Sequence, residues 1–169
     1  MMRPMPLIYV DMDKEEKAFQ DFYPEAFSHC FGCGSANPHG LHVRSYWSED
    51  ADDETVAHFT PHPYHTGGYP GFVYGGLIAA VLDCHGNGTA AAAGYRFRGR
   101  AMDSQPALRY VTASLQLDFL KPTPIGEVLE LRAKIAEVTE RKVRMELWLS
   151  AGGMVTVRAN MLSVLLPGS

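Results

Sequence analysis

The most informative stretch of the chain is residues 77–93, Leu77-Ile-Ala-Ala-Val-Leu-Asp-Cys-His-Gly-Asn-Gly-Thr-Ala-Ala-Ala-Ala93. It contains no proline and is rich in alanine, leucine, isoleucine and valine, which predicts a helix of about 17 residues, roughly 25 Å long. Apolar residues fall on nearly every side of this helix, as is typical of a helix buried on all faces. Other elements must therefore wrap around it.

The wrapping elements are predicted from the alternation of apolar and polar residues. Residues 108–120 alternate most regularly, with Val111 and Leu115 on one face and Thr112 on the other. The runs 128–138, 142–150 and 154–165 follow, separated by short turns as in an antiparallel meander. Two strands, 41–47 and 55–60, precede the helix. The predicted fold class is α+β, with one long buried helix wrapped by a curled antiparallel sheet of five to six strands.

Length and charge limit the domain organisation and the classes of partner. The chain has 169 residues, about the length of one domain, and 46% of them are hydrophobic. A short amphipathic helix is expected over 13–22, so we divide the chain into an N-terminal lead-in segment, 1–28, and a main domain, 29–169. The net charge of −4 lacks the basic field that nucleic acid binding needs, so no nucleic acid partner is expected.

Cysteine usage and the N-terminus favour a reducing compartment. Cys30, Cys33 and Cys84 cannot all pair with one another, and a domain of this size needs no disulfides. Near the N-terminus, prolines and acidic residues follow Arg3 before the apolar region of a signal peptide can form. The longest nearly apolar run, 75–82, is much shorter than the roughly 20 residues that cross a bilayer. We expect a cytoplasmic protein with no membrane partner.

Asp83 is the first candidate for a catalytic residue. Its helical neighbours three and four positions away are alanine, glycine and asparagine, with no cation among them. Burial without a charge partner raises the pKa of a carboxyl group, and such groups concentrate at functional sites. The alternative is that the helix breaks near Gly86 and Gly88, which leaves Asp83 as a cap.

Gly75 and Gly76 stand at the predicted start of the helix, where backbone N–H groups lack partners and the helix dipole is positive. Two glycines let a carbonyl oxygen approach closely, so this end can hold an oxyanion, although a plain glycine-rich entry turn explains them as well. Asp83 lies seven residues beyond Gly76, roughly 10 Å along the axis. A dimer that faces the glycine pair of one copy with Asp83 of the other would bring the two together.

Cys30-Phe-Gly-Cys33 has the spacing of a metal-binding motif, and His29 and His39 are near it in the sequence. A structural zinc site has four ligands, and the chain contains no second Cys-x-x-Cys. We therefore predict a packed loop here and no metal.

Three segments resemble one family in their order and spacing. They are Cys30-Phe-Gly-Cys-Gly-Ser-Ala-Asn-Pro-His-Gly-Leu41, Pro70-Gly-Phe-Val-Tyr-Gly-Gly-Leu-Ile-Ala-Ala-Val-Leu-Asp83 and Val111-Thr-Ala-Ser-Leu-Gln-Leu-Asp-Phe-Leu-Lys-Pro122. Through them, residues 28–165 resemble the hot-dog thioesterase superfamily and, within it, the PaaI-like acyl-CoA thioesterases. The resemblance implies the hot-dog fold, with two sheets joined edge to edge in a dimer.

The resemblance also implies catalytic roles at the matching positions. Asp83 falls where the family has a helical carboxylate, which acts as a nucleophile or as a general base toward water. Gly75 or Gly76 then supplies the amide that polarises the thioester carbonyl, and Thr112 assists beside the carboxylate. Tyr74 stands where the family has a histidine, so a hydrogen-bond donor is kept and the imidazole is lost.

Substrate-binding residues are expected outside this catalytic group. Basic side chains after the helix, with His65 from the loop before it, are the candidates for contacts with coenzyme A: Arg96, Arg98, Arg100, Arg109 and Lys121. A solvated basic loop explains the arginines equally well. His85 is a weak candidate to replace the missing family histidine, because helical geometry turns it about 200° away from Asp83.

We therefore predict an acyl-CoA thioesterase, or one that acts on acyl carrier protein, which releases free acid and thiol. It is expected to form a homodimer, or a homotetramer of two such dimers, and to need no metal or organic cofactor. The alternative is a non-catalytic acyl-CoA binding or sensor protein on the same fold. A fainter likeness to hot-dog dehydratases, through His58-Phe59, Pro63 and Pro70-Gly71, lacks the helical glutamate of that group.

Overall fold

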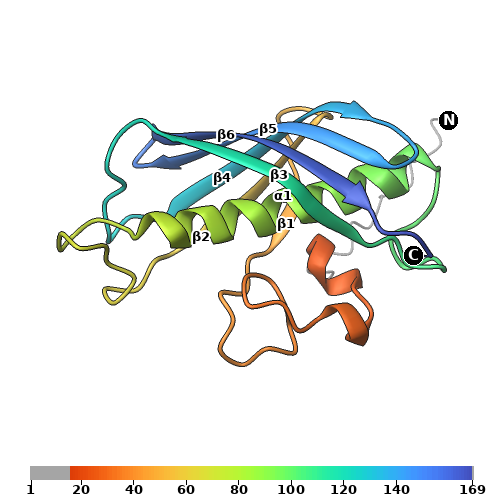
Figure 1. Cartoon of the computed structure of the whole chain (residues 1–169), viewed down its shortest axis with the longest axis horizontal. Coiled ribbons are helices and arrows are strands. Elements are labelled where there is room, and N and C mark those ends of the chain that lie inside the picture. Colours follow the sequence, from red (N-terminus) through yellow and green to blue (C-terminus); the bar gives the residue numbers. More distant parts are fainter. Residues whose placement is uncertain (1–15, 169) are drawn as a thin grey trace, which may run out of the picture.

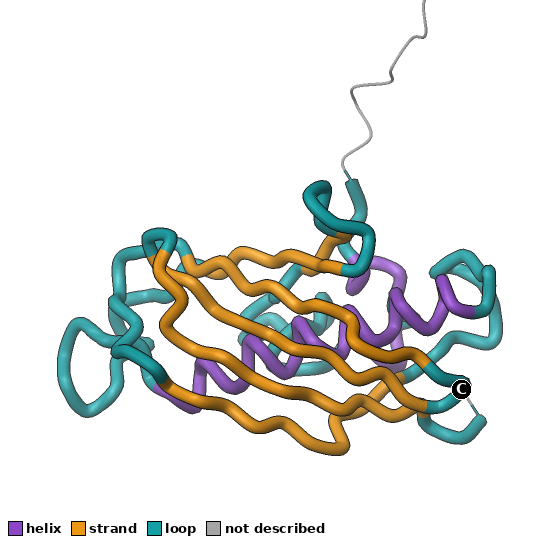
Figure 2. Tube along the Cα trace, turned by 90° about the horizontal axis from the view of Figure 1, so that it is seen from above, coloured by secondary structure: helices purple, strands orange, loops and turns teal. Residues whose placement is uncertain are grey.

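The computed structural model describes residues 16–168. Over these residues one long helix, α1 (Gly75–Phe97), lies across one face of a single antiparallel sheet (Figures 1 and 2). Its strands, in the spatial order β1-β2-β4-β5-β6-β3, are β1 (Ser45–Trp47), β2 (Glu54–Phe59), β3 (Tyr110–Phe119), β4 (Leu129–Val138), β5 (Lys142–Ala151) and β6 (Met154–Leu165). The predicted α+β architecture, with one long helix packed against an antiparallel sheet, is confirmed.

Helix α1 is longer than predicted and runs through Gly86 and Gly88 without a break. These glycines let the helix approach its neighbours closely, since a Cβ on Gly86 would lie 2.1 Å from the Met161 sulfur of β6. Close packing of this kind offsets the low helix propensity of glycine. The alternative in which the helix ends here and Asp83 caps it is therefore wrong.

A β-bulge at Ala113 interrupts β3, between the paired residues Thr112 and Ser114. The extra residue shifts the alternation by one position, so Thr112 contacts Asp83 of α1 while Leu115 packs against the same core. The sequence predicts Thr112 and Leu115 on opposite faces, and the bulge brings them to the same face. The Thr112 side chain thereby joins the buried Ser163 on the inner face of the sheet.

The first strand is shorter than predicted. Residues 41–44 lie outside β1, because the N–H groups of Leu41 and Val43 donate to the carbonyl groups of Phe31 and Gly32. The chain therefore runs along residues 30–34, which we call the cysteine loop, before it joins β2 at Ser45.

The lead-in helix predicted over 13–22 is seen in part. Within the described residues 16–22, Phe19–Phe22 forms the short 3-10 helix η1, and a second one, η2 (Glu25–Phe27), follows Pro24. Residues 13–15 of the expected helix lie outside the described residues. Instead of a regular amphipathic face, Gln20 anchors this segment, because its side chain bonds both the hydroxyl and the N–H group of Ser45 in β1.

The core lies between α1 and the inner face of the sheet, where β4 and β5 contribute fully buried leucines, Leu129, Leu131, Leu147 and Leu149. The strands β5 and β6 are joined at Gly152 and Gly153, whose φ values of 56° and 77° suit a tight hairpin turn. Within residues 16–168, no helix is long and apolar enough to cross a bilayer.

Candidate active site

A pocket of about 300 Å³ opens beside the middle of α1. The helix contributes Asp83 and Asn87 to its wall, β3 contributes Thr112, and the cysteine loop and the segment around η2 complete it. Arg109, just before β3, also lines it. The fold thus brings together two residues predicted for catalysis, Asp83 and Thr112, and one predicted for substrate binding.

Four side chains form a directed chain of hydrogen bonds at this wall. The Ser163 hydroxyl donates to Asn87 Oδ1 at 3.0 Å, Asn87 Nδ2 donates to Thr112 Oγ1 at 2.8 Å, and Thr112 donates to Asp83 Oδ1. Since a hydroxyl carries one proton, the bond from Asn87 directs the Thr112 proton toward Asp83. The chain therefore fixes the orientation of the carboxylate.

Sequence reasoning missed two members of this chain. Asn87 lies one helical turn after Asp83, so helical spacing alone would have placed both side chains on the same face. Ser163 has no comparable signal, because only the pairing of β3 with β6 brings it opposite Thr112.

Asp83 is half-buried, and no described residue forms an ion pair with it. Burial raises the pKa of its carboxyl group, the hydrogen bond from Thr112 opposes that rise, and the nearby Cys30 adds to it. This is the direction that the sequence predicts for a carboxylate without a cation.

The other predicted catalytic residues lie at the start of α1, away from the pocket lining. Tyr74 is the residue just before the helix, and its exposed ring folds over Gly76, where an added Cβ would meet the ring at 2.5 Å. His65 is bonded to the same segment, because its carbonyl group accepts a hydrogen bond from the Tyr74 N–H at 2.9 Å. The pKa of His65 is lowered, first by burial and then by His62. Within one chain, therefore, the glycine pair and Asp83 do not share a pocket.

The basic residues predicted to contact coenzyme A do not gather in one place. Three of them lie at the end of α1 and already bond other groups of the chain, namely Arg96, Arg98 and Arg100. Lys121 is exposed just after β3. Among the five, Arg109 is the residue that lines the pocket with Asp83.

The fold and this site can be compared with known proteins. The model of the thioesterase superfamily matches residues 70–158, more than half of the chain. The protein belongs to the thioesterase superfamily. The resemblance to hot-dog thioesterases is therefore confirmed, and the match includes the start of α1, Asp83 and Thr112.

Two relatives and one solved structure of the same fold resemble this chain. The acyl-coenzyme A thioesterase THEM4 of Xenopus laevis is 34% identical over 93 residues, which are 55% of this chain and 36% of THEM4, so the chain spans about a third of that relative. A thioesterase superfamily protein from Shewanella loihica PV-4 is 44% identical, with a TM-score of 0.63 over 84% of this chain and 97% of that one. A Streptococcus mutans protein, solved bound to acetyl CoA, is 13% identical and shares the fold alone, with a TM-score of 0.56 over 68% and 82% of the two chains.

In this thioesterase superfamily protein, His85 is not among the residues that line the pocket with Asp83. It is fully buried on the side of α1 that faces β1 and β2, with Nδ1 2.9 Å from the Ser45 hydroxyl and Nε2 3.4 Å from that of Thr55. Burial lowers its pKa to about 3, so the ring is neutral. His85 therefore does not replace the family histidine next to Asp83.

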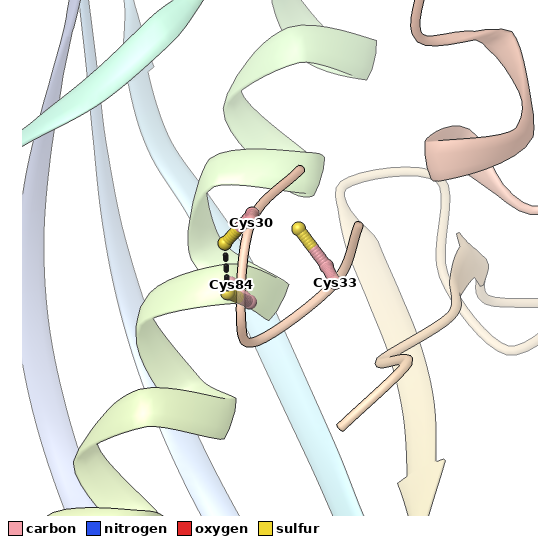
Figure 3. Close-up of side chains that lie close together, drawn as sticks. All are labelled: Cys30, Cys33 and Cys84. Carbon is pink, nitrogen blue, oxygen red and sulfur yellow. Dashed lines mark hydrogen bonds between the residues drawn. The ribbon is translucent and has the colours of Figure 1, made fainter. Parts of the chain in front are cut away.

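The cysteine loop places Cys30 and Cys33 against Cys84 of α1 (Figure 3). The Cys30 and Cys84 sulfur atoms are 3.6 Å apart. A hydrogen bond from Cys84 lowers the pKa of Cys30 to about 5, against the effect of burial, with further help from the N–H groups of Cys33 and Gly32. The same bond, together with burial, raises the pKa of Cys84, so that Cys84 keeps its proton. The sequence reasoning missed this group, because Cys84 is 54 positions from Cys30.

Proposed function

We propose that this protein hydrolyses the thioester bond of acyl-CoA, with Asp83 as the general base and Thr112 as its partner. The observation that carries the proposal is the Asp83 carboxylate at the wall of a pocket, oriented by the Thr112 hydroxyl and free of any cation among the described residues. A carboxylate held in this way serves a reaction rather than a surface ion pair.

The geometry supports a simple division of roles between the two carboxylate oxygens. Thr112 occupies Oδ1, which leaves Oδ2 to accept a proton from a water molecule. The oxygen of that water attacks the thioester carbonyl carbon, the C–S bond breaks, and the leaving thiolate takes up the proton that Asp83 accepted. The products are the free acid and coenzyme A.

Coenzyme A is the proposed carrier because of the relatives and of Arg109. THEM4 is named an acyl-coenzyme A thioesterase, and the Streptococcus mutans protein holds acetyl CoA. In this chain Arg109 lines the pocket, with its guanidinium group over the ring of Phe27, another lining residue, and a guanidinium group suits a phosphate.

A homodimer supplies the amide that the pocket lacks. Gly76 and Asp83 lie on one continuous helix, seven residues or about 10 Å apart, so a carbonyl held at Gly76 is out of reach of Asp83 of the same chain. Strand β3 is at an edge of the sheet, and Phe119 and Leu120 at its end are 56% and 53% exposed. Pairing of two β3 edges would cover these side chains and place the helix start of one copy near Asp83 of the other.

The activity is tested by thiol release from a panel of acyl-CoA esters, with acyl-pantetheine and acyl carrier protein as comparisons. We expect turnover by the wild type and none by Asp83→Asn, while both bind acyl-CoA. Binding of acyl-CoA without thiol release by the wild type would contradict the proposal and favour the acyl-CoA binding or sensor protein.

The shared site is tested by mixing two inactive chains. One carries Asp83→Asn, and the other carries Gly76→Pro, which removes the amide at a position in the first helical turn where proline is tolerated. The matched control is Gly76→Ala, which adds bulk beside Tyr74 but keeps the amide. Random pairing makes half of the dimers mixed, each with one intact site, so up to about one quarter of wild-type activity should return. Mixed dimers that form and stay inactive would contradict the shared site.

A further inference from the structure

All three cysteines of the chain meet at one point of the fold, although the sequence separates Cys84 widely from the other two. Their sulfur atoms lie within 4.8 Å of one another, and Figure 3 shows the cysteine loop folded against α1 so that they converge. Some point therefore lies within about 2.8 Å of all three sulfur atoms. This is about 0.5 Å longer than a Zn–S bond of about 2.3 Å, so small side-chain shifts would complete the contacts. The 3.6 Å between Cys30 and Cys84 is close to the roughly 3.8 Å between two sulfur ligands of a tetrahedral zinc ion.

The cysteine loop is folded tightly against the helix. The Gly34 N–H donates to the Cys30 carbonyl at 2.8 Å, which turns the loop back on itself. Gly32 is required for the close approach to the helix, because a Cβ there would lie 2.1 Å from the Cys84 sulfur. Packed thiols alone do not need this tight a contact between the loop and the Cys84 sulfur.

We propose that Cys30, Cys33 and Cys84 bind one thiophilic divalent cation, Zn²⁺ being the ion that three thiolates and a tetrahedral geometry suit best. All three sulfur atoms bind as thiolates, and the cysteines that still carry a proton release it to solvent as the ion binds. All three cysteines line the pocket that holds Asp83, so the fourth coordination position faces that pocket and is filled by a water molecule or another small ligand. The site does not depend on the proposed hydrolase activity.

Sequence reasoning discounted a metal here because one Cys-x-x-Cys provides two ligands. The fold adds Cys84 as a third, and the pocket leaves room for the fourth. Neither His29 nor His39, the neighbours considered from the sequence, belongs to the group of converging ligands.

The test is titration of the reduced, chelator-treated full chain with Co²⁺, followed by displacement with Zn²⁺. We expect thiolate-to-cobalt charge-transfer bands, visible bands typical of a tetrahedral site, and one metal ion per chain. Cys30→Ser and Cys84→Ala should each weaken Zn²⁺ binding by more than about a hundredfold, since even loss of an outer-shell partner costs 10 to 100-fold. His39→Ala, next to the same loop, is the matched control and should bind as the wild type does.

Three results would overturn the site. The first is a reduced wild-type chain without thiolate-to-cobalt bands, and the second is cysteine variants that bind Zn²⁺ as tightly as the wild type. The third is a Cys30–Cys84 disulfide found by thiol alkylation and mass spectrometry, in a chain that binds no metal after reduction, which would make the cysteines a redox pair. Cys30 is exposed, so Cys30→Ser keeps the test decisive even if Cys84→Ala disturbs the core.

Discussion

Helix α1 carries two polar groups of side chains on different faces, and they differ in what surrounds them. The carboxylate group, Asp83 and Asn87 with Thr112 and Ser163, lies at a pocket wall and contains an acidic side chain. The histidine group, His85 and Thr89 with Ser45 and Thr55, is buried, and its members bond one another.

The difference shows that burial of polar atoms is not by itself a sign of function. The histidine group satisfies its own hydrogen bonds inside the core, which stabilises one packing of α1 on β1 and β2. The carboxylate group leaves one Asp83 oxygen available at a pocket. We therefore assign stability to the first group and chemistry to the second, and the predictions below test that division.

The largest expected effect is on turnover when the carboxylate is neutralised. Asp83→Asn should lower kcat at least about a hundredfold, because the base is removed with little change in volume. Thr112→Ala alone should cost about tenfold. If Thr112 acts only through Asp83, the double variant should lose no more than Asp83→Asn does. Additive losses in kcat would show that Thr112 acts independently.

A second prediction concerns the pH dependence of stability. The pKa of His85 is lowered to about 3 by burial, whereas an unfolded histidine titrates near 6.5. Below pH 6.5 the unfolded chain binds a proton at His85 and the folded chain does not. The contribution of His85 to the free energy of unfolding is therefore fully present above pH 6.5 and is lost as the pH falls toward 3. The slope is about 1.4 kcal/mol per pH unit.

The control for this prediction is His85→Gln, which keeps a hydrogen-bonding side chain and removes the titration. Urea unfolding of both proteins at several pH values between 4 and 7, an interval of about three units, gives the difference in slope. Equal slopes would mean that His85 takes up its proton in the folded state, contrary to the buried, neutral ring.

A smaller effect is expected at Asn87, whose side chain bonds Thr112 and is expected to act through it. Asn87→Ala should lower kcat about tenfold with KM nearly unchanged, because the Thr112 hydroxyl is then free to rotate away from Asp83. Asn87→Gln at the same position tests whether a longer amide restores the contact. A change confined to KM would contradict a positioning role.

The smallest effect is expected at the basic residues. Arg109→Ala should raise KM for acyl-CoA several-fold and leave KM for acyl-pantetheine unchanged, because the latter lacks the nucleotide phosphates. Arg98→Ala is the matched control, since Arg98 already bonds the Gly94 carbonyl and Glu140. Equal effects of Arg109→Ala on both substrates would exclude a phosphate contact.

Local periodicity predicted most of the fold. Helix α1 and the strands from β3 to β6 were expected within a few residues of their observed bounds, because their patterns are local. The bulge at Ala113 and the short β1 were not predicted, since they depend on which distant strand or loop supplies the hydrogen bonds.

The candidate site was predicted in part. Asp83 was expected from its lack of a helical cation and Thr112 from the family resemblance, and the pocket brings the two together. Ser163 and the pairing of Cys84 with the cysteine loop could not be predicted, because only the folded chain brings these segments into contact. The basic residues form no sequence pattern that separates Arg109 from the others.

The division between the two groups on α1 is tested most directly by measuring kcat and the free energy of unfolding for Asp83→Asn and His85→Gln side by side. We predict that Asp83→Asn loses at least about a hundredfold in kcat while its unfolding free energy stays within about 1 kcal/mol of the wild type. His85→Gln should keep kcat within about twofold and lose about 1 to 3 kcal/mol of stability. An Asp83→Asn protein that retains most of its turnover, or a His85→Gln protein that loses as much turnover as Asp83→Asn, would contradict the account.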